Sequence, residues 1–137
     1  MIRSLAARVL LVATAGAAQY LSVYYAKPGG LWKTRRLLTV AGAHGFACDI
    51  NGSGEMGIGN AANLHVAASS PEVTLAGTIP VTSTSGTERT KVAGRKYLDD
   101  IIHAPFEFRD GHLVVPDGPG LGVDVDEEKL RRYAVEI

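Results

Sequence analysis

A literal Gly-x-Gly-x-x-Gly pattern, Gly52–Gly57, lies between a segment expected to be a strand and one expected to be a helix. In that setting, backbone N–H groups could hold the pyrophosphate of a dinucleotide at the amino end of the helix. Asp49 and Glu55 argue against this, because they would place carboxylates beside the anion. The acid that binds the ribose should end the next strand, whereas Glu72 begins it. We therefore expect a loop at a strand-to-helix edge, and dinucleotide binding stays open as an alternative.

The other residues with metal-binding or nucleophilic chemistry are scattered along the chain. The histidines, His44, His65, His103 and His112, are not spaced like a metal site. His65 falls on the apolar side of an expected helix, as a core histidine does. Cys48 is the only cysteine, so an internal disulfide is excluded. It is expected to be a buried thiol in a reducing compartment, the cytoplasm.

The composition is that of one ordinary domain. The chain has 137 residues, of which 46% are hydrophobic, enough for a globular core. Its formal net charge is zero, which argues against nucleic-acid binding, because such affinity comes from clustered Lys and Arg. We therefore expect no nucleic-acid partner. No uncharged run is long enough to span a bilayer, so we expect no membrane partner either.

The amino-terminal residues allow two interpretations. Met1–Ala18 has the outline of a signal peptide, with a basic start, an apolar stretch and small residues. Arg8 interrupts the apolar stretch, however, and the remainder is short. The same residues also have the pattern of an Ala-rich helix that precedes a strand.

Helical and strand patterns alternate along the first 79 residues. The predicted helices there are Ile2–Ala17, Leu31–His44 and Ile58–Ala68, and the predicted strands are Tyr20–Tyr25, Phe46–Ile50 and Val73–Gly77. Such alternation implies parallel strands joined by right-handed crossovers.

Beyond Ile79 the chain changes character, with a polar loop at Thr82–Thr90. Short segments separated by Pro, Asp and Gly follow at Tyr97–Ile102, Phe106–Arg109 and His112–Val115. A last short helix is predicted at Glu127–Tyr133. Asp126 is the expected N-cap of this last helix.

Four separated pieces carry a family resemblance. They are Ala26–Leu31, Thr39–Gly45, Gly57–Ala68, and Leu98–Asp100 together with Arg109–Lys129. In this order they resemble the Lys-x-Gly-Gly turn after the sixth barrel strand, the helix end before the seventh strand, the helix that follows it, and the closing tail. The family is the enolase superfamily, in its mandelate racemase/muconate lactonizing branch. The pieces occur in the family's order and cover nearly the whole chain.

The resemblance implies an α/β fold, the C-terminal part of a TIM-type β/α barrel. Residues 1–81 would form a partial barrel with the last three strands, six to eight, and their helices. Residues 82–137 would form a closing tail that packs on the capping domain. A whole barrel takes about 250 residues, so strands one to five would have to come from elsewhere.

The resemblance also implies a chemistry. Family members remove a proton α to a carboxylate with a Lys or His base, and Mg²⁺ stabilises the enediolate. The implied substrate is a small carboxylate, and the implied reaction is a cycloisomerisation, a racemisation or an acid-sugar dehydration. A full-length protein would be a homo-oligomer. In relatives the Mg²⁺ ligands lie on strands three to five, so we expect this chain alone to bind no metal and to be inactive.

The family's pattern assigns site residues in this sequence. The sixth-strand catalytic position, a Lys or Asp in relatives, falls on Tyr24, and the seventh-strand position falls on Asn51. Tyr24 could act as a base or a hydrogen-bond donor, and Asn51 could donate to a substrate oxygen. Lys27 and Glu55 are the expected substrate-binding residues. A strand aromatic, a turn residue and a solvated lysine remain the purely structural interpretations of Tyr24, Asn51 and Lys27.

One further function stays open. The chain could be a non-catalytic, truncated product that is stable only with a partner supplying the other strands. Exposed edges of parallel strands motivate this hypothesis, because unpaired edges invite pairing.

Overall fold

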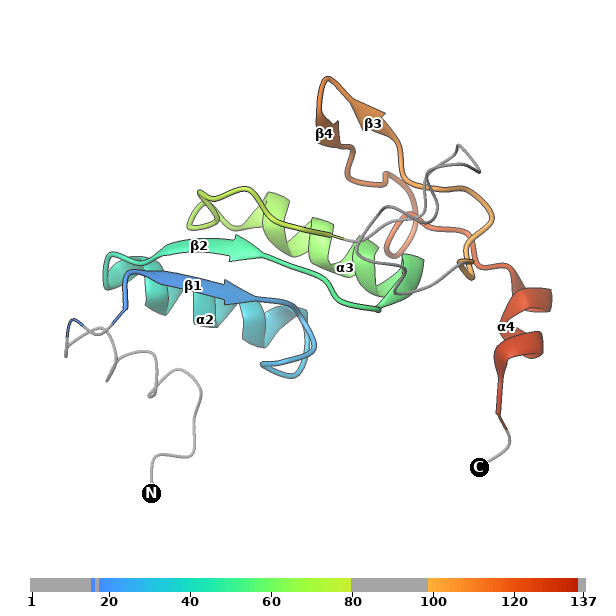
Figure 1. Cartoon of the computed structure of the whole chain (residues 1–137), viewed down its shortest axis with the longest axis horizontal. Coiled ribbons are helices and arrows are strands. Elements are labelled where there is room, and N and C mark those ends of the chain that lie inside the picture. Colours follow the sequence, from blue (N-terminus) through green and yellow to red (C-terminus); the bar gives the residue numbers. More distant parts are fainter. Residues whose placement is uncertain (1–15, 17, 80–98, 136–137) are drawn as a thin grey trace. The chain divides into compact units, whose positions relative to one another are not determined.

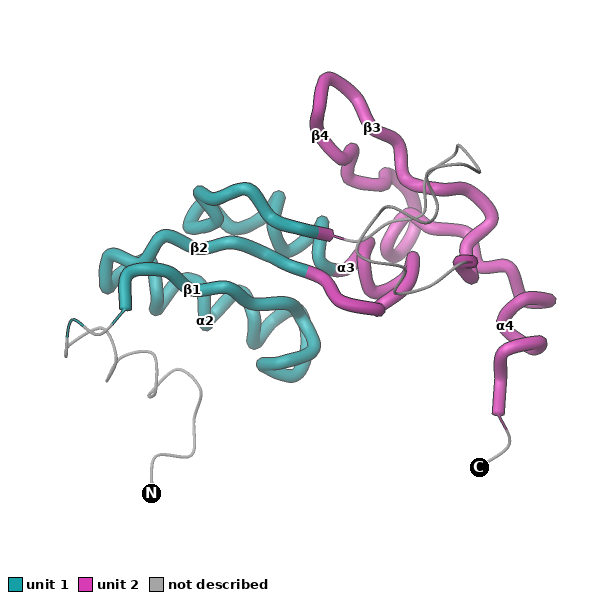
Figure 2. Tube along the Cα trace, viewed as in Figure 1, with its two compact units in different colours: residues 1–51, 63–78 teal, residues 52–62, 79–137 magenta. Residues whose placement is uncertain are grey.

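The computed structural model describes residues 16, 18–79 and 99–135. In chain order the elements are β1 (Tyr20–Val23), α2 (Leu31–Ala43), β2 (Ala47–Ile50), α3 (Met56–Ser69), β3 (Phe108–Arg109), β4 (His112–Leu113) and α4 (Glu127–Tyr133) (Figure 1). The chain divides into two compact units (Figure 2). Unit 1 comprises residues 1–51 and 63–78, and unit 2 comprises residues 52–62 and 79–137.

The centre of unit 1 is a parallel pair of strands covered by a helix. Strands β1 and β2 pair from Tyr20 opposite Ala47 to Val23 opposite Ile50. Figure 1 shows α2 running along one face of this pair. The buried residues of α2 recur at helical spacing, at Thr34, Leu37, Leu38 and Ala41. The alternation of strand and helix therefore produced the parallel pairing that the sequence predicts.

The predicted helix after the first strand is confirmed, and its end has a local cause. α2 stops at Ala43 with His44 as its C-cap. Gly45 follows with φ 77°, a left-handed conformation that glycine adopts without steric cost. The chain then turns directly into β2.

The predicted strand Val73–Gly77 is wrong. Only one parallel bridge forms there, between Cys48 and Val73. The N–H groups of Thr74 and Leu75 both donate to the Cys48 carbonyl, at 3.1 and 3.0 Å. Two consecutive donors on one acceptor mean that the chain bends instead of extending a ladder. The β-forming residues in this segment lacked a continuous partner, so local propensity did not decide the outcome.

Helix α3 is buried along most of its length. Its buried residues include the apolar Ala61, Leu64 and Val66 and the polar Asn60 and Asn63. It begins at Met56 and ends at Ser69, slightly longer at both ends than the predicted helix. Its residues 56–62 belong to unit 2 and its later residues to unit 1.

The described part of unit 2 contains little regular structure. Ile102 and Val125 form an antiparallel bridge, flanked by hydrogen bonds from His103 N–H to the Asp124 carbonyl and from Asp126 N–H to the Ile101 carbonyl. These bonds, 2.9 and 2.8 Å long, attach the last part of the tail to its beginning.

Strands β3 and β4 form a short hairpin closed by Asp110 and Gly111. Their φ angles are 50° and 78°. Two central residues with positive φ define the turn type that matches the twist of a hairpin, and Asp-Gly is a favoured pair for it. The short segments predicted on either side of this turn are therefore paired strands.

Helix α4 has the predicted bounds, Glu127–Tyr133, and the predicted cap. The Asp126 carboxylate accepts the Lys129 N–H at 3.0 Å. Glu127 and Glu128 occupy the first turn, where acidic side chains interact favourably with the helix dipole.

Two predictions lie outside the described residues. They concern the leader or helix at Met1–Ala18, of which only Gly16 and Ala18 are described, and the polar loop Thr82–Thr90. Among the helices that the structure describes, none is long and apolar enough to cross a bilayer.

Candidate functional site

Asn51 joins three segments at the carboxyl end of the parallel strands. Its Nδ2 donates to the Ser22 hydroxyl of β1 and to the Asp49 carboxylate of β2, the latter at 3.2 Å. Its Oδ1 accepts the Thr78 N–H at 2.6 Å. The amide's donors and its acceptor oxygen are therefore all engaged. In this geometry Asn51 positions the strand ends, and it would have to exchange a partner before donating to a substrate oxygen.

Tyr24 and Lys27 lie together in the turn after β1. The Lys27 N–H donates to the Tyr24 carbonyl at 3.2 Å. The Lys27 ammonium lies 5.1 Å from the centre of the Tyr24 ring, within range of a cation–π interaction. Lys27 is exposed and forms no ion pair with any residue that the structure describes. One turn thus combines a phenol and an ammonium that could bind an anion.

Tyr24 and Asn51 also lie at the same end of the sheet, beyond the carboxyl ends of β1 and β2. They follow the paired residues Val23 and Ile50, and the Asn51 N–H donates to the Val23 carbonyl at 3.0 Å. Because parallel strands end on one side, the residues after them meet at that side. The structure therefore brings two predicted site residues to the carboxyl end of the parallel strands.

The backbone of Tyr25 holds this turn in place. Its N–H donates to Oδ1 of Asn63 in α3 at 3.0 Å. Its carbonyl accepts the Gly30 N–H at 2.9 Å and the Thr34 hydroxyl at 3.3 Å. Asn63 is fully buried and Tyr25 is half-buried, so this bond ties the turn to the interior of unit 1. No sequence motif marks Asn63 as a site residue, although an amide in the middle of a largely apolar helix indicates a specific hydrogen-bond partner.

Glu55, the fourth predicted site residue, belongs to unit 2. Its carboxylate accepts the Ser53 hydroxyl at 2.8 Å and also the Ser53 N–H. An N–H group that a pyrophosphate would need is therefore bound to a carboxylate of the same loop. This contact does not favour dinucleotide binding at Gly52–Gly57.

Asp100, in the Leu98–Asp100 motif of the tail, carries a buried carboxyl group. Its Oδ1 accepts the N–H groups of Gly57, in the first turn of α3, and of Ile101, both at 2.7 Å. Its Oδ2 is buried and has no hydrogen-bond partner among the described residues. Burial raises the pKa of Asp100, and the two backbone N–H groups oppose this shift only in part.

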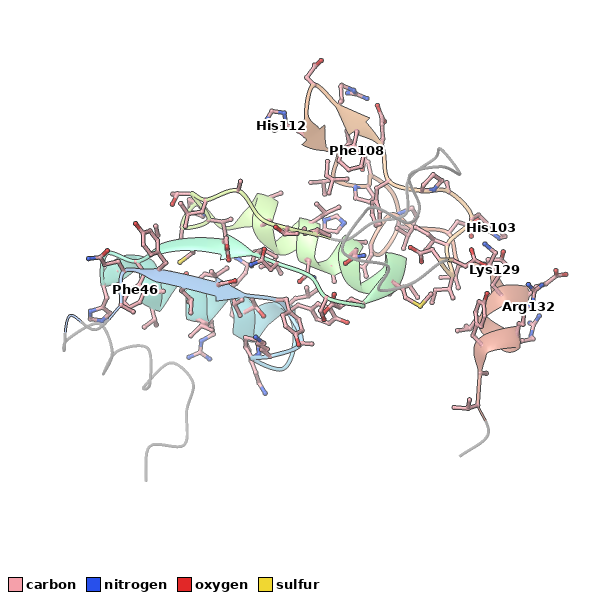
Figure 3. All side chains as sticks on the ribbon, in the orientation of Figure 1. Phe46, His103, Phe108, His112, Lys129 and Arg132 are labelled. Carbon is pink, nitrogen blue, oxygen red and sulfur yellow. The ribbon has the colours of Figure 1, made fainter. Side chains whose placement is uncertain are left out.

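The neighbouring carboxyl, Asp99, has the opposite environment. The Lys129 ammonium of α4 lies 2.8 Å from its Oδ1, and this hydrogen bond holds the pKa of Asp99 below its ordinary value. Figure 3 shows Lys129 and His103 close to the start of α4. His103 lies 3.8 Å from the carboxylate of the cap residue, Asp126.

The family follows from a comparison with known proteins. The family model described as enolase C-terminal domain-like matches residues 5–129. The chain belongs to this family. The match covers both described units and most of the closing tail.

Individual relatives carry several activities. The chain is 32% identical over 124 residues to muconate cycloisomerase 1 of Rhodococcus opacus, covering 90% of this chain and 30% of that protein. It is 39% identical over 108 residues to an N-succinylamino acid racemase of Amycolatopsis, covering 79% of this chain and 26% of that protein. Another relative is named a D-galactonate dehydratase family member, from Enterococcus gallinarum.

A solved structure agrees with the family. A probable mandelate racemase from Alicyclobacillus acidocaldarius superposes with a TM-score of 0.77 at 28% identity, covering 98% of this chain and 33% of that one. The fold is therefore that of the TIM-barrel-like C-terminal domain of the enolase superfamily. The chain spans a third or less of the length of these relatives.

Members of this superfamily generally use Mg²⁺, which takes oxygen ligands from carboxylates, carbonyls and water. No three His, Cys, Asp or Glu side chains converge in the part of the chain that the structure describes. Asp49 and Glu55 are hydrogen-bonded to Asn51 and Ser53. A Mg²⁺ site needs several oxygen ligands in octahedral geometry, so the described residues do not form one by themselves.

Proposed function

We propose that this chain contributes the strand-end part of an active site that acts on a small carboxylate. The reaction would be of the cycloisomerase, racemase or dehydratase type carried by its relatives. The observation that supports this most directly is the parallel pair β1–β2, with Tyr24 and Asn51 directly after the carboxyl ends of the two strands. In β/α barrels the catalytic groups lie at the carboxyl ends of the strands.

Each residue has a distinct role in this proposal. The Lys27 ammonium binds a carboxylate group of the substrate. Tyr24 donates a hydrogen bond to the substrate, or exchanges a proton with it, from the position of the sixth barrel strand. Asn51 fixes the distance between the ends of β1 and β2 through Ser22 and Asp49. Glu55 contacts the substrate only if it releases Ser53.

The chain by itself is proposed to be inactive. Proton removal next to a carboxylate needs charge stabilisation by a metal in this superfamily, and the described residues do not assemble such a site. Among the residues that the structure describes, β1 pairs only with β2, and its other edge has no strand partner there that would prevent a further strand from adding. The alternative function, a non-catalytic product that needs a partner, rests on this same edge.

The test is a titration of the chain with cis,cis-muconate, followed by nuclear magnetic resonance, with Mg²⁺ present and absent. We expect shifts at the turn that carries Tyr24 and Lys27, and no turnover. Lys27→Ala should abolish the shifts, whereas Arg109→Ala, which removes an equal and exposed charge, should not.

Two results would contradict the proposal. Shifts that persist in Lys27→Ala would remove the substrate-binding role of the turn. Turnover by the chain alone that EDTA abolishes would show that its metal ligands had been missed, and that it is active without further strands.

A further inference from the structure

Tyr24 and Lys27 are the first and fourth residues of one β-turn. The Lys27 N–H donates to the Tyr24 carbonyl at 3.2 Å, which is the bond that closes a turn of this kind. Tyr25 and Ala26 are its central residues, and the closing bond does not use the N–H group of Tyr25. The distance of 5.1 Å between the Lys27 ammonium and the centre of the Tyr24 ring therefore depends on the backbone angles of these two central residues.

A buried amide of α3 binds the N–H group that the turn does not use. Oδ1 of Asn63 accepts the Tyr25 N–H at 3.0 Å, and the two residues are 38 positions apart. Asn63 has no exposed surface, and both residues belong to unit 1. An N–H group requires an acceptor, so this bond fixes which side of the amide faces the turn. The other side, Nδ2, is buried and has no hydrogen-bond partner among the described residues.

The stability of α3 alone does not explain an asparagine at position 63. A buried N–H donor without a partner destabilises the folded chain. Leucine has a similarly branched side chain, carries no such donor and is a better helix former than asparagine. What leucine lacks is the oxygen that binds Tyr25. Residues that break a local rule in this way concentrate at functional sites, which here is the turn of Tyr24 and Lys27.

The carbonyl of Tyr25 is held from a different direction. It accepts the Gly30 N–H at 2.9 Å. The Thr34 hydroxyl lies 3.3 Å from the Tyr25 carbonyl and 2.8 Å from the Gly30 carbonyl, so its one hydrogen is shared between two acceptors. Both groups come from the start of α2, which directly follows the turn. Asn63 differs from them because it reaches the turn from an element that is distant in sequence.

We propose that Asn63 is a positioning residue that holds the Tyr25 N–H and thereby sets the spacing of the Lys27 ammonium and the Tyr24 ring. Without this bond the peptide group before Tyr25 can rotate, and the ammonium leaves the ring face. That the positioned pair binds a carboxylate rests on the proposed function. The hold of Asn63 on the turn does not rest on it.

Two signals of the chain without ligand test this hold. Protons over the face of an aromatic ring resonate upfield, so the Hε protons of Lys27 report their position relative to Tyr24. Amide hydrogen exchange reports whether the Tyr25 N–H is bonded. In the wild-type chain we expect an upfield Lys27 Hε signal and slower exchange at Tyr25 than at the exposed Ala26. Exchange at Tyr25 as fast as at Ala26, after correction for sequence, would overturn the proposal without any variant.

Two variants at position 63 have opposite expected effects. Asn63→Leu should move the Lys27 Hε signal to its position in an unstructured peptide, and should speed exchange at Tyr25 about tenfold or more. Asn63→Asp keeps an acceptor oxygen at the same reach and should restore much of both signals. Circular dichroism establishes that each variant is folded. An upfield Lys27 signal that persists in folded Asn63→Leu would contradict the positioning role.

Two further variants serve as controls. Ser70 directly follows α3, is buried, and has a hydroxyl with no hydrogen-bond partner among the described residues. Ser70→Ala should therefore leave both signals unchanged. Thr34→Val removes the shared hydroxyl but leaves the Gly30 N–H on the Tyr25 carbonyl, so it should move the Lys27 signal less than Asn63→Leu does. Equal effects of Ser70→Ala and Asn63→Leu would indicate a general loss of packing and would count against a specific role of Asn63.

A titration with cis,cis-muconate separates this inference from the proposed function. Loss of one hydrogen bond should weaken binding about three- to tenfold in Asn63→Leu. Asn63→Asp should recover part of the affinity, since its added charge opposes an anion. A wild-type chain that does not bind muconate would contradict the proposed function, and the signals without ligand would still decide the role of Asn63. Equal affinity of the wild-type chain and Asn63→Leu would show that Asn63 does not position the pair for binding.

Discussion

In unit 1, helix α2 buries a continuous side against a parallel pair of strands, whereas in unit 2 helix α4 buries no residue. The tail around α4 is held instead by individual polar contacts. Asp126 caps the helix, Lys129 binds Asp99, and the backbone at Asp126 bonds to Ile101. The first arrangement spreads its stabilisation over many apolar contacts, and the second concentrates it in a few bonds.

The two units therefore illustrate two ways in which a sequence can hold a segment in its folded conformation. A repeating apolar stripe tolerates small changes, because each residue contributes a part of a shared burial energy. A segment held by single bonds and by unusual backbone angles depends on the residue type at each point. Comparing the stability lost on truncating a core side chain in unit 1 with that lost on truncating a side chain of α4 can therefore test whether the two units differ in this way.

The largest expected effect is the loss of a core side chain in unit 1. Leu38 has no exposed surface, so Leu38→Ala should lower the free energy of unfolding by about 2–5 kcal/mol. Leu130→Ala, at a half-exposed position of α4, should change it by about 0.5 kcal/mol or less. Urea denaturation of dilute samples measures both, and similar losses would contradict the comparison.

An intermediate effect is expected from two glycines that are needed for different reasons. A side chain at Gly77 would collide with the Ile50 carbonyl, so Gly77→Ala should cost about 1–3 kcal/mol. Gly111 has open space around it but φ 78°, so Gly111→Ala should cost about 1 kcal/mol.

Asparagine distinguishes the two causes. It tolerates the left-handed conformation, so Gly111→Asn should recover much of the stability lost in Gly111→Ala. Gly77→Asn should be at least as damaging as Gly77→Ala, because the added atoms meet the same carbonyl. Recovery at both positions, measured by thermal unfolding, would show that the close approach at Gly77 is not rigid.

The smallest expected effect is a pair of opposite pH dependences in the tail. The pKa of Asp100 is raised, chiefly by burial. Its contribution to the free energy of unfolding is therefore present below the ordinary carboxyl pKa and is lost as pH rises through the raised value. The pKa of Asp99 is lowered, chiefly by its hydrogen bond with Lys129. Its contribution to the free energy of unfolding is therefore present above the ordinary carboxyl pKa and is lost as pH falls through the lowered pKa.

Two conservative variants should separate these contributions. Asp100→Asn keeps an oxygen for the N–H groups of Gly57 and Ile101, and should flatten the fall in stability with rising pH. Asp99→Asn should flatten the fall toward acid pH. Urea midpoints across the acidic and neutral range measure both slopes. Unchanged slopes in the two variants would remove these carboxyls as the source of the pH dependence.

Local patterns predicted the regular elements well. The apolar spacing within Leu31–His44 and Ile58–Ala68 and the Asp126 cap gave α2, α3 and α4 close to their observed bounds. Val73–Gly77 failed because a strand needs a partner along its length, and only Val73 found one. The pattern within a segment does not include that partner.

The candidate site divides in the same way. The residues of the turn, Tyr24 and Lys27, came from the sequence, and they do lie together because only three positions separate them. The partners of Asn51 and of the Tyr25 backbone did not, since Thr78 and Asn63 are 27 and 38 residues away. Such bonds depend on which elements meet after the strands have paired.

The sequence by itself determined where helices and turns begin and end, because caps, apolar spacing and glycine angles act between near neighbours. It also carried the motifs from which the family was inferred. Only the tertiary structure decided that Asn51 is engaged by three segments, that Asp100 is buried at the start of α3, and that Trp32 of α2 is exposed. Burial and long-range hydrogen bonds arise from packing, which no single segment contains.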